Sequence, residues 1–286
     1  MIALRTEEYR IASARELDIE KTFECGQCFR WNADAGGVYT GVAMGRAARV
    51  RSAGGQVYIR SDAPESFWRE YFDLDRDYAA ISREFHGGEY LDECVRYGAG
   101  IRILRQEPWE ALCSFIISQC NNITRIKGIV ERLCEGFGDT AELDGERFYT
   151  FPQAGRLAAL EPEELSSLRC GYRAPYIIAA ARAVDSGRLD LDSLIHTDYL
   201  TAKRELLRLP GIGEKVANCV ALFGLGHMEG FPIDVWIRRA LKEHFPQDFD
   251  PESLGEYAGL AQQYIFFYAR SHGGAHKAEH AENASI

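Results

Sequence analysis

The chain has 286 residues, of which 46% are hydrophobic and 27% charged, and its formal net charge is −10. These proportions are those of an ordinary globular protein that can bury a core. The first residues, MIALRTEEYR, lack a sustained apolar run, and no stretch reaches the roughly 20 apolar residues of a membrane helix. We therefore expect a soluble protein inside the cell, in a prokaryotic cytoplasm or nucleoid or in a nucleus, with no membrane partner and no secretion.

Short segments rich in β-branched or aromatic residues occupy residues 8–62, separated by pairs of glycines. FECGQCFRW, GVYTGVAMG, RAARVRSAG and GQVYIRS are typical of strands. They predict an antiparallel sheet of four to six strands. With flanking helices, this N-terminal domain is expected to span residues 1–95.

From about residue 74 the apolar residues follow the period of helices. In TRIKGIVERLCEGFG, residues 124–138, they step by three and four, which is typical of an amphipathic helix that ends at a glycine. Strands followed by helices predict an α+β fold, with a helical core over 96–270. The polar stretch 271–286 is predicted to be a frayed tail.

Charge and cysteine content limit which partners and metals the chain is expected to bind. The negative net charge alone argues against non-specific nucleic-acid binding. However, acidic residues dominate 62–93 and 141–164, whereas lysines and arginines gather around turns and helix starts farther along the chain. Cys25 and Cys28 are the one close cysteine pair, and no second ligand pair follows, so zinc is not expected.

The stretch LRLPGIGEKVANC, residues 207–219, places a tight glycine turn between two helical patterns. Gly211 and Gly213 allow a sharp turn and leave backbone amides at the positive end of the next helix, which suits an anion. This spacing predicts a helix-hairpin-helix at about 200–225 that holds one DNA backbone phosphate. The alternative is a turn between helices whose glycines serve steric needs alone.

Lys215 lies in the first turn of the helix after this hairpin, and GFPIDVWIRRAL follows. Asp234 precedes the helical run VWIRRAL and is therefore placed as its N-cap, a role worth about 1 kcal/mol. Two antiparallel helices joined in this way would bring the two side chains across one cleft. Because phosphate binding needs only backbone amides, the pair favours Lys215 as a nucleophile.

The segments LPGIGEKVANC and FPIDV resemble the helix-hairpin-helix superfamily of base-excision glycosylases, in which such a lysine and aspartate are catalytic. The resemblance is strongest to the 8-oxoguanine DNA glycosylases. It implies an N-terminal sheet like that of the TATA-box-binding protein, followed by a two-lobed helical core. The segments that carry it, in the family's order, are CGQCFRW (25–31), YFDLDRDY (71–78), SFIISQCNNITRIKGIVERLC (114–134), GYRAPYI (171–177) and YAGLAQQYIFF (257–267).

The resemblance implies a monomeric DNA glycosylase and abasic-site lyase for duplex DNA with 8-oxoguanine opposite cytosine. Lys215, as a neutral amine, would attack C1′ and form a Schiff base that allows β-elimination. Asp234 would stabilise charge on the sugar. Two alternatives stay open: a glycosylase of the same superfamily for another damaged base, and a non-catalytic DNA-binding protein that uses the hairpin alone.

The lesion must leave the helix and be told apart from guanine. 8-Oxoguanine has an N–H donor at N7 where guanine has an acceptor, so a fixed carbonyl discriminates between them. By resemblance this carbonyl belongs to Gly26. Cys219 and Phe266 would cover the two faces of the base, Gln262 would bond its Watson–Crick edge, and Phe115 would line the pocket.

The same resemblance assigns residues to the duplex. Tyr172 matches the wedge beside the estranged cytosine, and Arg125 and Arg173 match arginines that read its acceptor edge. The other expected DNA contacts are Cys120, Asn121, Asn122, Gly211, Gly213 and Trp236.

Three positions depart from the family's pattern. Cys120 stands where the first of three asparagines is usual, Trp236 replaces a histidine expected near a phosphate, and Asn218 stands where animal members carry an acid. In the family the first asparagine fills the space that the flipped base leaves, and Cys120 does not offer that contact.

No catalytic cofactor is implied. Because no cysteine follows Cys219, the four-cysteine iron–sulfur cluster of the endonuclease III type is not expected. A structural cation at the hairpin would be held by the main-chain carbonyls of Leu207, Leu209 and Ile212.

Overall fold

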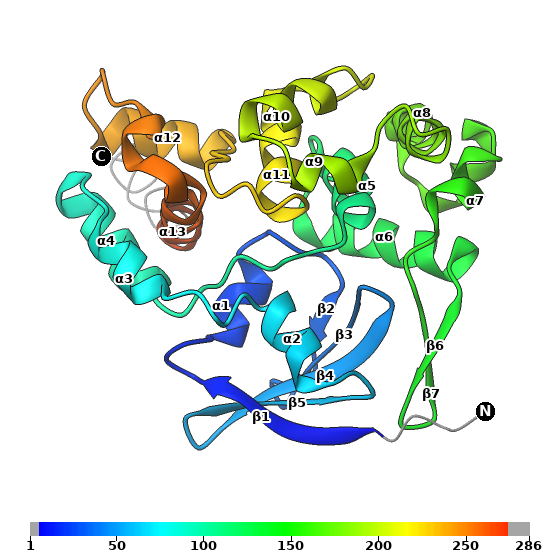
Figure 1. The fold of residues 1–286 in the computed structure, drawn as a ribbon, viewed down its shortest axis with the longest axis horizontal. Coiled ribbons are helices and arrows are strands. Elements are labelled where there is room, and N and C mark those ends of the chain that lie inside the picture. Colours follow the sequence, from blue (N-terminus) through cyan, green and yellow to red (C-terminus); the bar gives the residue numbers. More distant parts are fainter. Residues whose placement is uncertain (1–5, 274–286) are drawn as a thin grey trace, which may run out of the picture.

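The computed structural model describes residues 6–273, so the predicted tail at 271–286 lies almost entirely outside the described residues. An antiparallel five-stranded sheet in the order β1-β5-β4-β3-β2 forms its N-terminal part, which confirms the predicted sheet (Figure 1). The strands are β1 (Glu7–Ser13), β2 (Trp31–Ala33), β3 (Tyr39–Ala43), β4 (Arg46–Ala53) and β5 (Gln56–Ser61).

Helices make up most of the remainder, and the predicted α+β class is confirmed. Figure 1 shows the sheet below the helices, with α12 and α13 on one side of α10 and α11 and with α7 and α8 on the other. None of the described helices is long and apolar enough to cross a membrane. The elements are α1 (Ile19–Glu24), α2 (Glu65–Tyr71), α3 (Tyr78–Arg83), α4 (Gly88–Gly98), α5 (Pro108–Ser118), α6 (Ile123–Phe137), α7 (Ala154–Ala158), α8 (Ala174–Asp185), α9 (Leu191–Ile195), α10 (Tyr199–Leu207), α11 (Glu214–Phe223), α12 (Val235–His244) and α13 (Ala258–His272), the 3-10 helices Pro162–Leu168, Gly171–Arg173 and Pro251–Tyr257, and a hairpin of β6 (Thr140–Leu143) and β7 (Glu146–Tyr149).

The segment FECGQCFRW is not the strand that its composition predicts. Its first residues end α1, a turn follows, and extended structure begins only at Trp31. The apolar side chains divide between two cores: Cys25 and Phe29 pack in the helical core, whereas Cys28 packs under the sheet. Because both faces of this turn are buried, its hydrophobicity resembles that of a strand.

The hairpin β6–β7 was not predicted, although its Asp144-Gly145 turn is a strong hairpin signal. Both turn residues have positive φ, 53° and 81°. The hairpin reaches from the helical core to the sheet, where Asp144 accepts hydrogen bonds from Arg49 at 2.7 Å and from Arg60 at 2.6 and 2.7 Å. Leu143 packs beside β3 and β4, so the hairpin joins the two parts of the chain.

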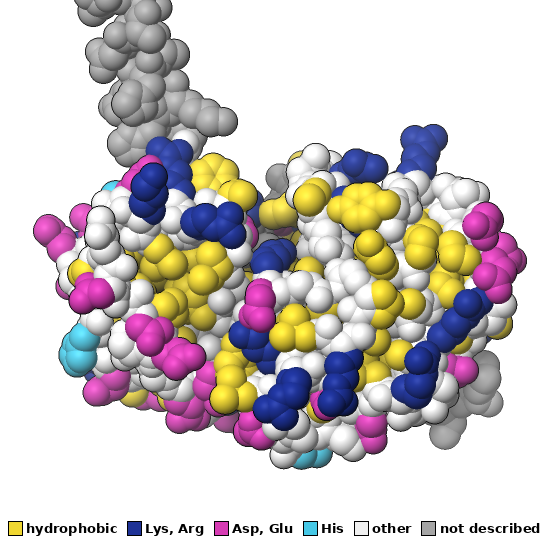
Figure 2. Space-filling view, turned by 90° about the horizontal axis from the view of Figure 1, so that it is seen from above, with side chains coloured by type: hydrophobic (Ala, Val, Ile, Leu, Met, Phe, Trp, Pro, Cys, Tyr) yellow, Lys and Arg dark blue, Asp and Glu magenta, His cyan; other side chains and the backbone are white. Residues whose placement is uncertain are grey.

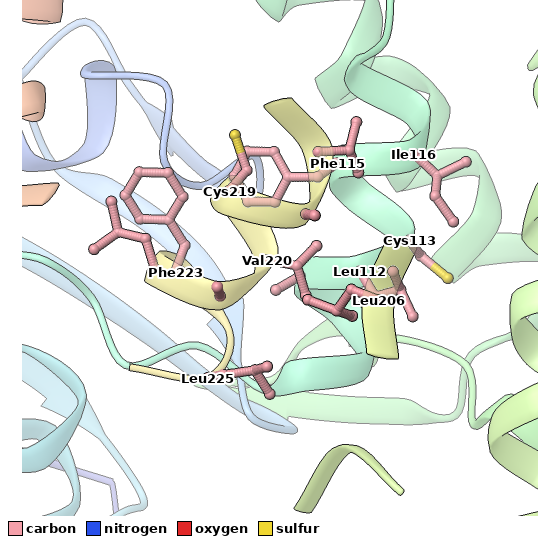
Figure 3. Close-up of a cluster of buried hydrophobic side chains, with 14 of the residues drawn as sticks. Leu112, Cys113, Phe115, Ile116, Leu206, Cys219, Val220, Phe223 and Leu225 are labelled. Carbon is pink, nitrogen blue, oxygen red and sulfur yellow. The ribbon is translucent and has the colours of Figure 1, made fainter. Parts of the chain in front are cut away.

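Helices α5 and α11 form the centre of the helical core. Figure 3 shows Cys219, Val220 and Phe223 of α11 against Leu112 and Phe115 of α5. The rings of Phe115 and Phe223 stack with their centroids 5.3 Å apart. This contact holds the end of α11 against the second half of α5.

Helix α4 crosses the predicted end of the N-terminal domain at residue 95 and packs against α13 of the helical core. The division of the chain at residues 95 and 270 therefore stays a prediction.

We predict that Gly138→Ala lowers the free energy of unfolding by roughly 1–3 kcal/mol, because an added methyl group would overpack the end of α6. A Cβ there would lie 2.0 Å from the Thr150 carbonyl oxygen and 2.6 Å from that of Cys134. The matched control is Gly136→Ala in the same helix, where nothing lies within 4 Å of the added Cβ. It should raise stability by up to about 1 kcal/mol. Urea unfolding measures both, and equal values for the two variants would contradict this packing.

Candidate active site

A cavity of about 60 Å³ lies where α5, α11, α13 and the turn at Gly26 meet. It brings together Lys215, Asp234 and every residue that the sequence predicts to touch the flipped lesion, from segments far apart in the chain. The lining residues are Cys25, Gly26, Phe115, Lys215, Cys219, Phe223, Pro232, Asp234, Gln262, Gln263 and Phe266.

Lys215 is held by a residue that the sequence did not single out. Its Nζ donates to Ser118 Oγ at 3.3 Å, and that hydroxyl in turn donates to the Phe115 carbonyl oxygen at 2.8 Å. The ammonium also lies 5.7 Å from the centroid of the Phe115 ring, within the range of cation–π attraction. Ser118 is buried at the end of α5, three residues after Phe115, and that helical spacing is the signal that could have found it.

Asp234 is the N-cap of α12, as predicted. Its Oδ1 accepts hydrogen bonds from the backbone amides of Trp236 and Ile237, both at 2.9 Å. Because both amides use Oδ1, the cap fixes the carboxylate without using Oδ2. The second oxygen is thus available to stabilise positive charge in the cavity.

The side chain of Gln27 stabilises the turn at Gly26 through hydrogen bonds, a role that the sequence did not predict. Gln27 is fully buried, and its Nε2 donates to the carbonyl oxygens of Thr22 at 2.9 Å and Arg102 at 2.7 Å. Its Oε1 accepts from the Leu104 amide at 2.8 Å. Gly26 itself has φ +79°, a conformation that glycine adopts without strain. The backbone carbonyl of Gly26 is therefore held in a fixed place.

The opposite wall comes from α13. The Phe266 ring lies 3.2 Å from the point where a Cβ on Gly26 would stand, so the two walls are in contact. Arg270, one turn later, donates to the Glu24 carbonyl oxygen at 2.9 Å, and its guanidinium lies 5.9 Å from the Phe266 ring centroid. This arginine ties α13 to the end of α1.

Cys219 is buried on the face of α11 that meets the cavity. Burial raises the pKa of its thiol, and the nearby Lys215 opposes that shift in part. The side chain is therefore a neutral, polarisable surface at neutral pH, suited to lie against an aromatic ring.

Glycine occupies the two hairpin positions for different structural reasons. Gly211 has φ +80°, and a Cβ there would lie 2.4 Å from the Tyr176 ring, so glycine is required by the fold. Gly213 is the N-cap of α11 with φ −101°, and nothing lies within 4 Å of an added Cβ. The space in front of Gly213 is open to a group from outside the protein.

The loop between α5 and α6 holds the predicted DNA contacts near residue 120. Cys120 is exposed and has φ +47°, which is unusual for a residue with a side chain. Asn121 donates to the Ile117 carbonyl oxygen at 3.1 Å, and Asn122 caps α6 by accepting from the Arg125 amide at 2.9 Å. The Arg125 side chain is exposed.

Tyr172 and Arg173 lie beside this loop in contrasting environments. Tyr172 is 54% exposed, whereas Arg173 is 3% exposed. The Arg173 guanidinium donates to the carbonyl oxygens of Gln119, Cys120 and Cys170 and lies over the Tyr172 ring at 4.4 Å. In this state the Arg173 side chain stabilises the loop between α5 and α6 through these carbonyl oxygens.

Trp236 lies away from the cavity. A Cβ on Gly273 would lie 2.3 Å from its ring, which lines a separate hollow with Tyr90 and Tyr268. The structure thus gives the Trp236 side chain a packing contact at the end of α13.

Charge is unevenly spread over the surface. Figure 2 shows lysine and arginine side chains across the middle of one face, among exposed apolar side chains, with acidic side chains mainly toward its margins. A face of this kind can meet a polyanion although the net charge is negative.

Comparisons with known proteins agree with this arrangement. Residues 10–112 match the family model of the 8-oxoguanine DNA glycosylase N-terminal domain, and residues 113–256 match that of HhH-GPD superfamily base excision DNA repair proteins. The N-glycosylase/DNA lyase OGG1 of Arabidopsis thaliana is 29% identical over 88% of this chain and 77% of its own length.

Two solved structures are similar over nearly the whole chain. The 8-oxoguanine glycosylase/lyase of Clostridium acetobutylicum, in complex with double-stranded DNA containing cytosine opposite 8-oxoguanine, is 33% identical with a TM-score of 0.85, covering 94% of this chain and 98% of its own. MBOgg1, in complex with a low-affinity DNA ligand, is 38% identical with a TM-score of 0.86, covering 94% and 96%.

We predict that a thiol reagent in excess modifies Cys120 alone in the native protein, because the other seven of the eight cysteines are buried. Burial also raises the pKa of buried thiols such as Cys25, to about 12, and so disfavours the reactive thiolate. Titration with a chromogenic disulfide should give one fast thiol, none in Cys120→Ser, and eight after denaturation. A second fast thiol in the native protein would contradict the burial of the cavity wall.

Proposed function

The chain belongs to the HhH-GPD superfamily of base excision DNA repair proteins and carries the N-terminal domain of the 8-oxoguanine DNA glycosylases, and we propose that it excises 8-oxoguanine opposite cytosine and then cleaves the abasic strand. The observation that carries this proposal is the single cavity that joins Lys215, Asp234 and Gly26. The family works without a cofactor. A DNA substrate would place the activity inside the cell, and one cavity in one chain is consistent with a monomer.

Lys215 acts as the nucleophile. Its neutral amine attacks C1′ as the N-glycosidic bond breaks, and the bonding electron pair leaves with the base, which takes up a proton. The sugar opens to a Schiff base, and loss of a 2′ proton then expels the 3′ phosphate. Ser118 orients the amine, and Asp234 stabilises the positive charge that develops on the sugar.

The Gly26 carbonyl oxygen accepts the N7–H of the lesion and repels the N7 lone pair of guanine. Phe266 and Cys219 cover the faces of the base, Gln262 meets its Watson–Crick edge, and Phe115 closes the end of the pocket. The cavity of about 60 Å³ is far smaller than the roughly 300–1,000 Å³ of typical ligand sites. Phe266 must therefore move away from Gly26 as the base enters.

The DNA is held mainly through its backbone. The amides near Gly211 and Gly213 bind a phosphate at the start of α11, where no side chain obstructs its approach. Tyr172, exposed beside the loop, fills the space next to the unpaired cytosine. Arg125, which is exposed and donates to the Arg169 carbonyl oxygen at 3.5 Å, gives up this long contact to reach the edge of that base. Arg173 reaches it only by exchanging its carbonyl partners.

The remaining predicted contacts take lesser roles. Cys120, Asn121 and Asn122 border the space that the flipped base leaves in the duplex. Trp236 contributes its backbone amide at the start of α12, where it donates to Asp234, and its ring does not face the DNA site. A cation at the hairpin would use the carbonyls of Leu207, Leu209 and Ile212. The Leu209 oxygen already accepts from the Ile212 amide at 3.2 Å, which leaves it one further lone pair.

Borohydride trapping tests the proposal. With a duplex that carries 8-oxoguanine opposite cytosine, the wild type should give a covalent adduct, and Lys215→Gln should give none because the amine is gone. Asp234→Asn, which keeps a capping oxygen, should fold but lose about 10²-fold or more in rate. An undiminished adduct in Lys215→Gln would refute the assignment of the nucleophile.

Two other outcomes would favour the alternative functions. A faster reaction with an alkylated base or an oxidised pyrimidine would favour another substrate. Salt-sensitive binding of the duplex without strand cleavage would favour a non-catalytic DNA-binding protein.

We further predict that Gly213→Ala keeps the fold but weakens binding to any duplex, with or without a lesion, by about tenfold or more. The added methyl group would project into the open space at the start of α11 and hold a phosphate away from the amides. Fluorescence anisotropy with a labelled duplex measures the affinity. Retention of full affinity would show that the phosphate binds elsewhere.

A further inference from the structure

One polar atom of the cavity lacks a partner. Gln263 is 3% exposed and lines the cavity, and its Oε1 is buried with no hydrogen-bond partner among the residues that the structure describes. A buried carbonyl oxygen left unpaired destabilises the folded protein. Such an atom is uncommon and calls for an explanation.

The neighbouring hydrogen bonds determine which end of the Gln263 amide is unpaired. The Pro232 carbonyl oxygen can only accept, so the group that bonds it at 3.0 Å must be the Nε2 of Gln262. The Oε1 of Gln262 then faces Gln263 and accepts from its Nε2, also at 3.0 Å. Gln263 is thereby left with its oxygen, an acceptor, as the unpaired atom.

We propose that Gln263 is a further specificity-determining residue, whose Oε1 accepts a hydrogen bond from an N–H on the Watson–Crick edge of the flipped purine. This inference rests on the proposed function. The Gly26 carbonyl serves N7 on the opposite edge, and guanine-type bases carry N1–H and a 2-amino group on the Watson–Crick edge. Two adjacent amides, Gln262 and Gln263, are oriented by a common chain of hydrogen bonds that starts at Pro232.

The chemistry of the acceptor defines the bases that it favours. An adenine-type base has a 6-amino donor on this edge but an unprotonated N1 where guanine-type bases carry N1–H, and the N1 lone pair would repel Oε1. A base with N–H donors at this position satisfies an oxygen that is otherwise buried without a partner among the described residues. Gln263 therefore selects guanine-derived lesions, while Gly26 selects the oxidised one.

The test compares duplex affinities in the Lys215→Gln background, where the bond stays intact. Gln263→Met keeps the volume of the side chain and removes the acceptor. It should weaken binding of the 8-oxoguanine·cytosine duplex by about fivefold to tenfold, as expected for one hydrogen bond. Binding of a duplex with a tetrahydrofuran abasic analogue should change by less than about twofold, because no base enters the pocket.

The control is Gln153→Met, which alters an exposed glutamine at the start of α7 and should change neither affinity. Equal losses on both duplexes in Gln263→Met, or no loss on the lesion duplex, would overturn the inference. If Gln263→Met does not fold, Gln263→Asn, which withdraws the oxygen by one methylene, carries the same comparison. If the Lys215→Gln protein shows no preference for 8-oxoguanine over guanine, the proposed function fails instead.

Discussion

The packing of α5 against α11 is the contact on which the site depends. Lys215 lies in the first turn of α11 and Ser118 ends α5, so the bond between them lasts only while the two helices keep their register. The apolar side chains between them fix that register, since a close-packed core tolerates little sliding (Figure 3). A lysine on a loose segment would lose much of its orientation, and with it much of its effective concentration near C1′.

The turn at Gly26 adds a second constraint, because it belongs to both cores. Cys25 and Phe29 anchor it in the helical core, and Cys28 anchors it under the sheet. Gln27 then joins it to the segment at 102–104. The N-terminal domain thus contributes directly to the base pocket, although most of its sheet lies far from the lysine in the sequence.

The free protein carries local energetic costs at the cavity and in the loop beside it. Gln263 has an unpaired buried oxygen, Cys120 has a left-handed backbone, and the base cavity is nearly closed by Phe266. Strained or unsatisfied groups of this kind are typical of functional sites, where a ligand satisfies them. A base that hydrogen-bonds to the unpaired groups of the cavity recovers part of the free energy that is needed to flip it out of the duplex.

The sequence by itself determined the class of fold, the helix-hairpin-helix, the N-cap at Asp234 and the family, because caps, turns and helical periods depend on residues within about four positions of one another. Sequence also named seven of the eleven residues that line the cavity, through resemblance. It did not determine the conformation of FECGQCFRW, the reach of the β6–β7 hairpin, or the parts taken by Ser118, Gln27 and Gln263. Their partners come from other segments of the chain: Lys215 for Ser118, Arg102 and Leu104 for Gln27, and the amide relay from Pro232 for Gln263. Only the tertiary structure brings those partners within hydrogen-bond distance, and for that reason it alone decided which polar atoms of the cavity are satisfied and that the Gln263 Oε1 is not.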